Sequence, residues 1–137
     1  MSAQGTFATA LNCMDGRCQE KAYMFAQQAS GADFIDMITE PGIDGLLSGT
    51  HSVVSAEDIP GKISWIRAKA EISAKGHGSK QCVIFGHCGC AGNQVTFEEH
   101  RAHLLAALEK VRGWGLFDEV RAAAFTEDWT LEEVRSA

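Results

Sequence analysis

Short hydrophobic runs alternate along the chain with segments in which hydrophobic residues recur every three or four positions. The short runs predict buried strands at residues 7–12, 34–38, 81–85 and about 119–125. The helical spacing predicts helices at about residues 19–29, 62–75 and 97–111. Gly31 is a typical stop after the first helix, and Thr96 with Glu99 forms a capping-box pattern before the third.

Strands that alternate with helices pair in parallel through right-handed crossovers. The pattern therefore predicts an α/β fold, a three-layer domain with a mainly parallel four-stranded sheet in the order 2-1-3-4. Residues 44–60 show no clear period, and we expect a long loop there with at most a short helical piece. The tail from Glu127 receives no element, and its glutamates are expected to form a solvated face. No linker or repeat divides the chain, so residues 1–137 are expected to form one domain.

Composition narrows the class of partner. The formal net charge of −6 provides no basic surface for nucleic acid or an anionic membrane, which leaves a small-molecule substrate as the expected partner. No hydrophobic run is long enough for a membrane span or a secretory leader, so a cytoplasmic location is expected. In that setting, clustered cysteines beside a histidine are more typical of metal ligands or catalysts than of disulfides.

The clearest candidate chemistry follows the first and third predicted strands. In a 2-1-3-4 sheet the strand order reverses between these two strands, and ligands bind beyond their carboxyl ends. The first strand leads into Cys13 and the third into His87. If the chain stays extended after Cys13, then Cys13, Asp15 and Arg17 point to the same side. The glycines around His87 let the backbone curl, so that His87 and Cys90 turn inward as well.

We therefore predict one Zn²⁺ per chain, bound by Cys13, His87 and Cys90. Thiolate and imidazole are usual zinc ligands, and three protein ligands keep a fourth position for water or substrate. Asp15 is able to fill that position and close the site. Arg17 is able to hold Asp15 in a bidentate pair and leave the position open.

The remaining cysteines have simpler interpretations. Cys88 lies between two candidate ligands, and its contact with the metal stays open against packing beside it. A redox pair of Cys88 and Cys90 is disfavoured because the usual spacing is C-x-x-C. Cys18 and Cys82 are expected to pack as small buried residues.

Two further sets of residues have structural interpretations. His100 and His103 fall one helical turn apart without a companion carboxylate motif, so a partly exposed helix surface is expected there rather than a second metal site. The three tryptophans are candidate anchors for a partner subunit, with core packing expected for at least one of them: Trp65, Trp114 and Trp129.

These residues carry a family resemblance. The pattern C-x-D-x-R after one strand, followed by H-x-x-C after a later parallel strand, resembles the β-class carbonic anhydrases. Here it is matched by Cys13, Asp15, Arg17, His87 and Cys90. Segments 11–17, 37–42 and 90–93 are similar to a branch of short carbonic-anhydrase-like chains. The similarity extends from about residue 8 to residue 129.

The resemblance implies a zinc-dependent lyase that interconverts carbon dioxide and bicarbonate through a zinc-bound hydroxide. It gives Asp15 and Arg17 the catalytic task of orienting that hydroxide, and it implies a homodimer or higher homo-oligomer. Residues 39–42 stand where larger relatives carry an Arg-Asn segment, and Ala91 replaces a usual glycine. Two alternatives therefore stay open. One is a carbonyl sulfide or carbon disulfide hydrolase, and the other is a non-catalytic zinc or bicarbonate-binding module closed by Asp15.

Overall fold

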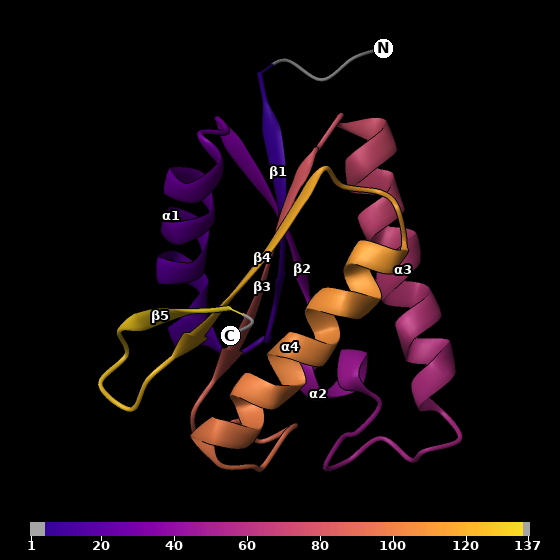
Figure 1. The fold of residues 1–137 in the computed structure, drawn as a ribbon, viewed down its shortest axis with the longest axis vertical. Helices are drawn as coiled ribbons and strands as arrows, with labels where there is room; N and C mark the ends of the chain where they lie inside the picture. Colours follow the sequence, from indigo (N-terminus) through magenta and orange to yellow (C-terminus); the bar gives the residue numbers. More distant parts are fainter. Residues whose placement is uncertain (1–4, 136–137) are drawn as a thin grey trace.

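A five-stranded sheet runs through the protein in the order β2-β1-β3-β4-β5 (Figure 1). The computed structural model describes residues 5–135. The strands are β1 (Phe7–Asn12), β2 (Phe34–Thr39), β3 (Gln81–His87), β4 (Glu119–Phe125) and β5 (Leu131–Val134). The first four pair in parallel and β5 pairs antiparallel with β4. The predicted α/β fold, with a mainly parallel sheet and the order 2-1-3-4, is confirmed, and β5 is an additional edge strand.

Helices cover both faces of the sheet. They are the 3-10 turn η1 (Gly16–Cys18), α1 (Gln19–Ser30), α2 (Ile43–Ser48), α3 (Ile59–Gly76) and α4 (Phe97–Gly113). Helix α1 lies on one side of the sheet, and α3 and α4 lie on the other (Figure 1). Gly31 ends α1, as predicted, and does so in the left-handed conformation, and Thr96 and Glu99 form the predicted capping box of α4.

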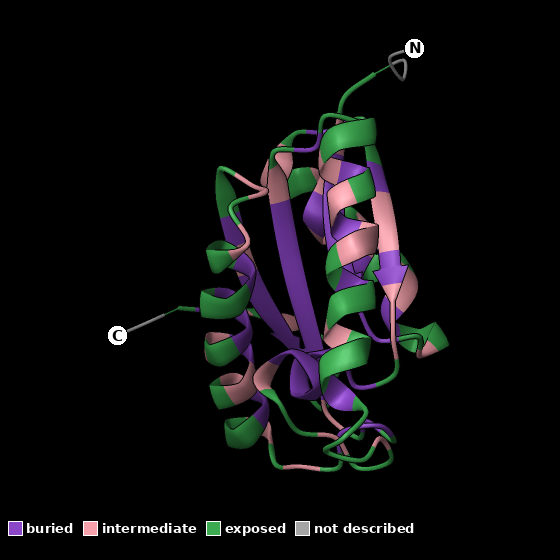
Figure 2. Cartoon of the chain, turned by 90° about the vertical axis from the view of Figure 1, so that its right-hand side faces the viewer, coloured by how far each residue is buried: buried purple, intermediate pink, exposed green. Residues whose placement is uncertain are grey.

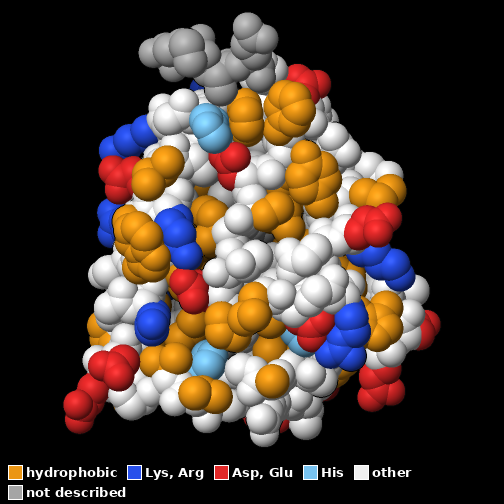
Figure 3. All heavy atoms as spheres, turned by 180° about the vertical axis from the view of Figure 1, so that it is seen from behind, with side chains coloured by type: hydrophobic (Ala, Val, Ile, Leu, Met, Phe, Trp, Pro, Cys, Tyr) orange, Lys and Arg blue, Asp and Glu red, His pale blue; other side chains and the backbone are white. Residues whose placement is uncertain are grey.

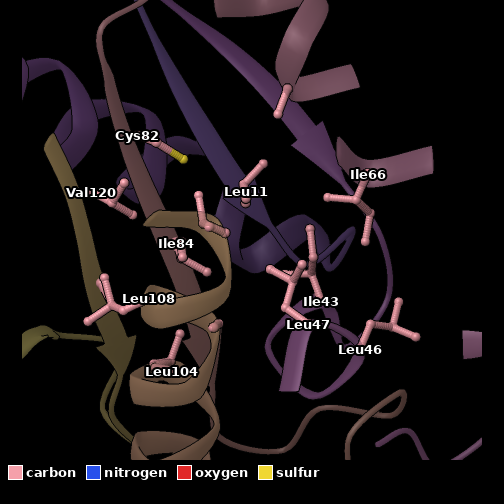
Figure 4. Close-up of a cluster of buried hydrophobic side chains, with 14 of the residues drawn as sticks. Leu11, Ile43, Leu46, Leu47, Ile66, Cys82, Ile84, Leu104, Leu108 and Val120 are labelled. Carbon is pink, nitrogen blue, oxygen red and sulfur yellow. The ribbon is translucent and has the colours of Figure 1, made fainter. Parts of the chain in front are cut away.

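Alternation along the strands produces two separate hydrophobic cores. On β3 and β4, Ile84 and Ala122 belong to the core under α2, α3 and α4, which Figure 4 shows. Their chain neighbours Phe85 and Ala123 belong to the core under α1. The central strands are therefore buried on both faces (Figure 2), as their nearly continuous hydrophobic sequences require.

The short helical piece allowed for within residues 44–60 is present at the start of that segment. Helix α2 occupies Ile43–Ser48, and Ile43, Leu46 and Leu47 are buried in the core beside α3 and α4 (Figure 4). Six residues are fewer than two helical turns, so no hydrophobic period is visible in the sequence. The short helical piece allowed for this segment is thus a part of the core.

The chain after Glu127 also contains an element that was not predicted. Strand β5 pairs with β4, with Leu131 opposite Phe125 and Val134 opposite Ala122. Glu132 is exposed, as expected of a solvated face, whereas Val134 is buried. A four-residue strand offers too short an alternation to be recognised. Within residues 5–135, no helix has the length and hydrophobicity needed to cross a membrane.

Candidate metal centre

Three of the predicted site residues meet beyond the carboxyl ends of two neighbouring strands. Because β1 and β3 pair in parallel, Cys13 after β1 lies next to His87 at the end of β3. Cys90 follows in the turn after β3. One potential ligand atom from each of the three residues lies within 4.8 Å of the other two, and all three side chains are buried. The turn of the chain at the strand ends therefore builds the cluster that the sequence predicted.

The His87 ring presents a bare nitrogen to this cluster. Its Nδ1 lies 2.8 Å from the carbonyl oxygen of Cys88 and donates a hydrogen bond to it. That bond fixes the tautomer and leaves a lone pair on Nε2. The Nε2 atom is buried and has no hydrogen-bond partner among the described residues. A buried nitrogen without a partner is costly, and a bound metal ion would satisfy it.

The two sulfurs have the separation that zinc requires. Cys13 Sγ lies 3.9 Å from Cys90 Sγ, far beyond the bond length of about 2.0 Å in a disulfide. Two sulfurs bound tetrahedrally to zinc at about 2.3 Å each are about 3.8 Å apart. The donor set of two thiols and one imidazole is also the chemistry that zinc prefers. The residues present therefore fit a zinc ion.

The surroundings of Cys13 favour its thiolate. The Cys90 thiol donates to the Cys13 sulfur, and this is the main reason why the pKa of Cys13 is lowered to about 4. Burial opposes the shift, and the backbone N–H of Gly42 adds to it. The pKa of Cys90 is raised because its proton is held against Cys13. Zinc binds thiolates, so a first thiolate is already favoured before a metal arrives.

Asp15 and Arg17 form the bidentate pair that was predicted, but on a different backbone. The chain does not stay extended after Cys13, because the Asp15 side chain caps η1 by accepting from the Arg17 backbone N–H at 2.9 Å. Arg17 Nε then donates to Asp15 Oδ1 at 3.0 Å and its terminal nitrogen to Oδ2 at 2.7 Å. These bonds lower the pKa of Asp15 to about 2. Asp15 Oδ2 lies 3.9 Å from His87 Nε2, at the edge of the cluster.

The sequence comparison decides the family. The family described as "Putative carbonic anhydrase" matches residues 3–135. The chain belongs to this carbonic anhydrase family. The β-carbonic anhydrase CafA of the fungal pathogen Aspergillus fumigatus is a similar solved structure, with a TM-score of 0.47 and 16% identity. That match covers 94% of this chain and 76% of the other. A comparison with curated proteins gives no match.

In this member of the carbonic anhydrase family, Cys88 lies outside the cluster. Its half-buried side chain lines a separate crevice together with Phe97, Thr126 and Glu132. Burial raises the pKa of the Cys88 thiol. The position favours packing over metal contact for Cys88. Cys18 and Cys82 are buried in the core, as predicted.

The expectation of a partly exposed surface at His100 was wrong. His100 is completely buried, and its Nδ1 lies 2.6 Å from Asp44 Oδ2, which is also buried. Asn93 donates to Asp44 Oδ1 at 3.1 Å and its Nδ2 also lies 2.9 Å from Nδ1 of the half-buried His103. In the same turn, the Asn93 backbone N–H donates to the Cys90 carbonyl oxygen at 3.3 Å. Asp44 thus supports the turn that carries a candidate ligand.

The importance of Asp44 and Asn93 was missed from the sequence. One signal was available, since Asp44 is a single charged residue within a hydrophobic stretch, a pattern that indicates a buried partner. The close approach of α2 to this turn also depends on glycine. A Cβ on Gly45 would lie 2.7 Å from the Asn93 side chain, and one on Gly42 would lie 2.7 Å from the Gly92 backbone.

Trp129, which the sequence left as an anchor or core residue, lies beside the metal centre. Its ring stacks on the His87 ring with centroids 5.8 Å apart and an angle of 28° between the planes. The Arg17 guanidinium carbon lies 4.6 Å from the Trp129 ring centroid. No pattern in the sequence indicates these contacts, because they depend on the turn between β4 and β5.

Proposed function

We propose that this protein is a zinc-dependent lyase that interconverts carbon dioxide and bicarbonate. The observation that carries the proposal is the convergence of two thiols and a bare imidazole nitrogen, in a chain that belongs to a carbonic anhydrase family. Cys13, His87 and Cys90 would hold the ion. When bound, zinc would act as a Lewis acid and lower the pKa of water toward about 7, which makes a nucleophile available near neutral pH.

Asp15 and Arg17 would orient the reactants at this centre. With its pKa lowered to about 2, Asp15 stays ionised at neutral pH and would accept a hydrogen bond from a water or hydroxyl placed beside it. Arg17 occupies both carboxylate oxygens with its own donors, which restrains Asp15 from turning fully toward His87. The guanidinium also supplies positive charge next to the place where bicarbonate would form.

The test is stopped-flow hydration of carbon dioxide by protein of measured zinc content. We expect the wild-type chain to bind one zinc and to be active, and Cys90→Ser to bind zinc more weakly and to lose activity. Cys88→Ser is the matched control, because Cys88 is two positions away and points into another crevice. Arg17→Ala should lower activity and keep the metal. Stoichiometric zinc without hydration at neutral to alkaline pH would refute the proposed reaction but not the metal site.

A second function is supported by one distance. Asp15 Oδ2 is only 3.9 Å from His87 Nε2, so a small rotation of Asp15 would bring it onto a metal held there. The protein would then be a zinc-binding module without catalysis. The bidentate pair with Arg17 favours the open site instead. A carboxylate that stays on the metal at alkaline pH in the wild-type chain would favour the closed module.

We also propose that residues 1–137 form one domain, which acts as a homodimer or higher homo-oligomer in the cytoplasm. Among the described strands, β2 pairs only with β1 and leaves its outer edge open. Phe34 on β2 and Met24 on α1 are exposed. Figure 3 shows hydrophobic side chains spread among charged ones over the face seen from behind. Open sheet edges favour pairing with another chain. All five cysteines lie outside disulfides, which is compatible with a cytoplasmic location.

A further inference from the structure

We propose that Trp129 is a positioning residue, which holds the Arg17 guanidinium against Asp15 and thereby keeps Asp15 away from the open position of the metal centre. The inference rests on the proposed zinc site and concerns what keeps that site open. Trp129 would touch neither the ion nor the substrate. It would act through Arg17.

Four side chains form a closed ring of contacts. Asp15 is bound by Arg17 through two hydrogen bonds, and Arg17 lies over the Trp129 ring at 4.6 Å. Trp129 in turn stacks on His87 at 5.8 Å, and His87 Nε2 lies 3.9 Å from Asp15. The indole therefore lies against both a candidate metal ligand and the partner of Asp15. Moving the indole would disturb both at once.

Arg17 needs such a support because its side chain is 60% exposed, whereas that of Asp15 is only 21% exposed. An exposed arginine normally samples many rotamers, and a surface ion pair alone restrains it weakly. The face of an indole attracts a guanidinium and offers it a flat surface to stack on. Trp129 thus limits the movement of the one residue that holds Asp15.

The backbone of Trp129 supports a functional interpretation of its side chain. Its φ of 62° makes it the one described non-glycine residue with a positive φ. It ends a three-residue turn between Thr126 and Thr130, a position where such hairpins favour glycine. A bulky residue in the left-handed region is strained, and such strain is concentrated at functional sites. The strained residue here is the one whose ring contacts Arg17 and His87.

The turn is also held firmly in place. Lys21 on α1 donates to the Trp129 carbonyl oxygen at 2.8 Å, and the Trp129 amide donates to Thr126 at 3.0 Å. The indole packs against Phe125, with ring centroids 5.8 Å apart. Figure 1 shows the β4–β5 hairpin reaching beneath α1. The backbone of Trp129 is therefore tied to α1 and its indole packs against the sheet, so the ring is suited to restraining a mobile neighbour.

The first experiment needs no metal. Heteronuclear NMR of the metal-free chain should show the Arg17 Nε–H proton shifted upfield by the indole ring current and exchanging slowly with water. In Trp129→Leu this exchange should become about two- to fivefold faster, as expected for the loss of an exposed cation–π contact. Trp65→Leu is the matched control, because Trp65 is an exposed residue of α3 that also lies near a cation, with Lys69 Nζ 5.7 Å from its ring centroid. It should leave Arg17 unchanged.

The second experiment uses Co²⁺ as the probe, since the visible spectrum of thiolate-bound Co²⁺ reports its fourth ligand. Arg17→Ala should change the spectrum because it releases Asp15. Trp129→Leu should change the spectrum in the same direction, and Trp129→Phe should change it less. The double variant, Arg17→Ala with Trp129→Leu, should show no larger spectral change than Arg17→Ala alone. This experiment does not depend on the hydration of carbon dioxide. If the expected spectral changes occur in a protein that shows no hydration in the stopped-flow test, the proposed reaction is refuted and the role of Trp129 is supported.

Three results would overturn the inference. One is an Arg17 resonance without an upfield shift in the wild-type chain, which decides the matter even if no Trp129 variant folds. Another is unchanged Arg17 exchange in Trp129→Leu. The third is a spectral change in Trp129→Leu that persists in full in the Arg17→Ala background, because Trp129 would then act on the His87 ring alone.

Discussion

Replacing Asp44 with alanine is expected to destabilise the protein by about 3–5 kcal/mol, because both hydrogen bonds to its buried carboxylate are lost. The Asp44 carboxylate accepts from His100 at 2.6 Å and from Asn93 at 3.1 Å, and none of these three side chains is appreciably exposed. Each hydrogen bond to a charged group contributes about 1.5–3 kcal/mol, so the loss of two such bonds accounts for the expected loss of stability. His100 would be left without a partner on either ring nitrogen.

Asp44→Asn should be milder, with a loss of about 1–2 kcal/mol. Its amide oxygen still accepts from Asn93. Its amide nitrogen can donate to His100 Nδ1 once that ring adopts the other neutral tautomer. The ranking of the two variants therefore tests the hydrogen-bond assignment separately from the volume of the side chain.

Urea unfolding of the metal-free, reduced protein, followed by circular dichroism, measures both effects. At a slope of about 2 kcal/mol per molar, Asp44→Ala should lower the midpoint by about 1.5–2.5 M. Asp118→Ala is the control, since Asp118 is exposed, and its effect should stay within about 0.5 kcal/mol. A loss below about 1 kcal/mol in Asp44→Ala would refute the two buried hydrogen bonds.

Further predictions concern the capping of α4, a buried thiol and a close backbone approach. Thr96→Ala should cost about 1 kcal/mol in thermal unfolding, and an unchanged Tm would contradict the capping box. Hydrogen bonds from Thr96 lower the pKa of Glu99, so the stability Glu99 adds is present above pH 4.5 and lost as the pH falls through its lowered value. Glu99→Ala should therefore matter less in acid than at neutral pH in urea titrations. Burial raises the pKa of Cys18 to about 12, so iodoacetamide should not label Cys18 in the native protein at mildly alkaline pH. Mass spectrometry measures the labelling, and labelling as fast as in the unfolded chain would contradict the burial of Cys18. Gly45→Ala should cost about 1–3 kcal/mol because its Cβ would lie 2.7 Å from Asn93, and a neutral effect, as expected for Gly113→Ala, would refute that contact.

The strands and the long helices could be predicted because each covers enough residues to show its period. Strand β1 and the start of α1 were predicted at the residues where they occur, and β4 was predicted over Glu119–Phe125 as observed. Helix α2 was allowed for only as a short helical piece without bounds, and strand β5 was not predicted, because six and four residues are too few for periodicity to be recognised. These short elements are stabilised by tertiary packing, as the burial of Leu46 and Val134 shows.

The residues of the candidate site also divide into those that the sequence predicts and those that it does not. Cys13 and His87 could be expected to meet, because they follow neighbouring parallel strands and the topology alone brings such strand ends together. The supporting residues could not be expected, since their contacts depend on tertiary packing between elements that lie far apart in the sequence. Asp44 meets His100 only because α2 packs on α4, and Trp129 reaches Arg17 only because a strained turn directs it there.

The central claim is a metal centre built from two thiolates and one imidazole, and X-ray absorption at the zinc edge of the zinc-loaded protein tests it most directly. The account predicts two sulfurs at about 2.3 Å and one nitrogen at about 2.0–2.1 Å, with one sulfur lost in Cys90→Ser. A shell of nitrogen and oxygen alone, or a sulfur count that Cys90→Ser leaves unchanged, would contradict it.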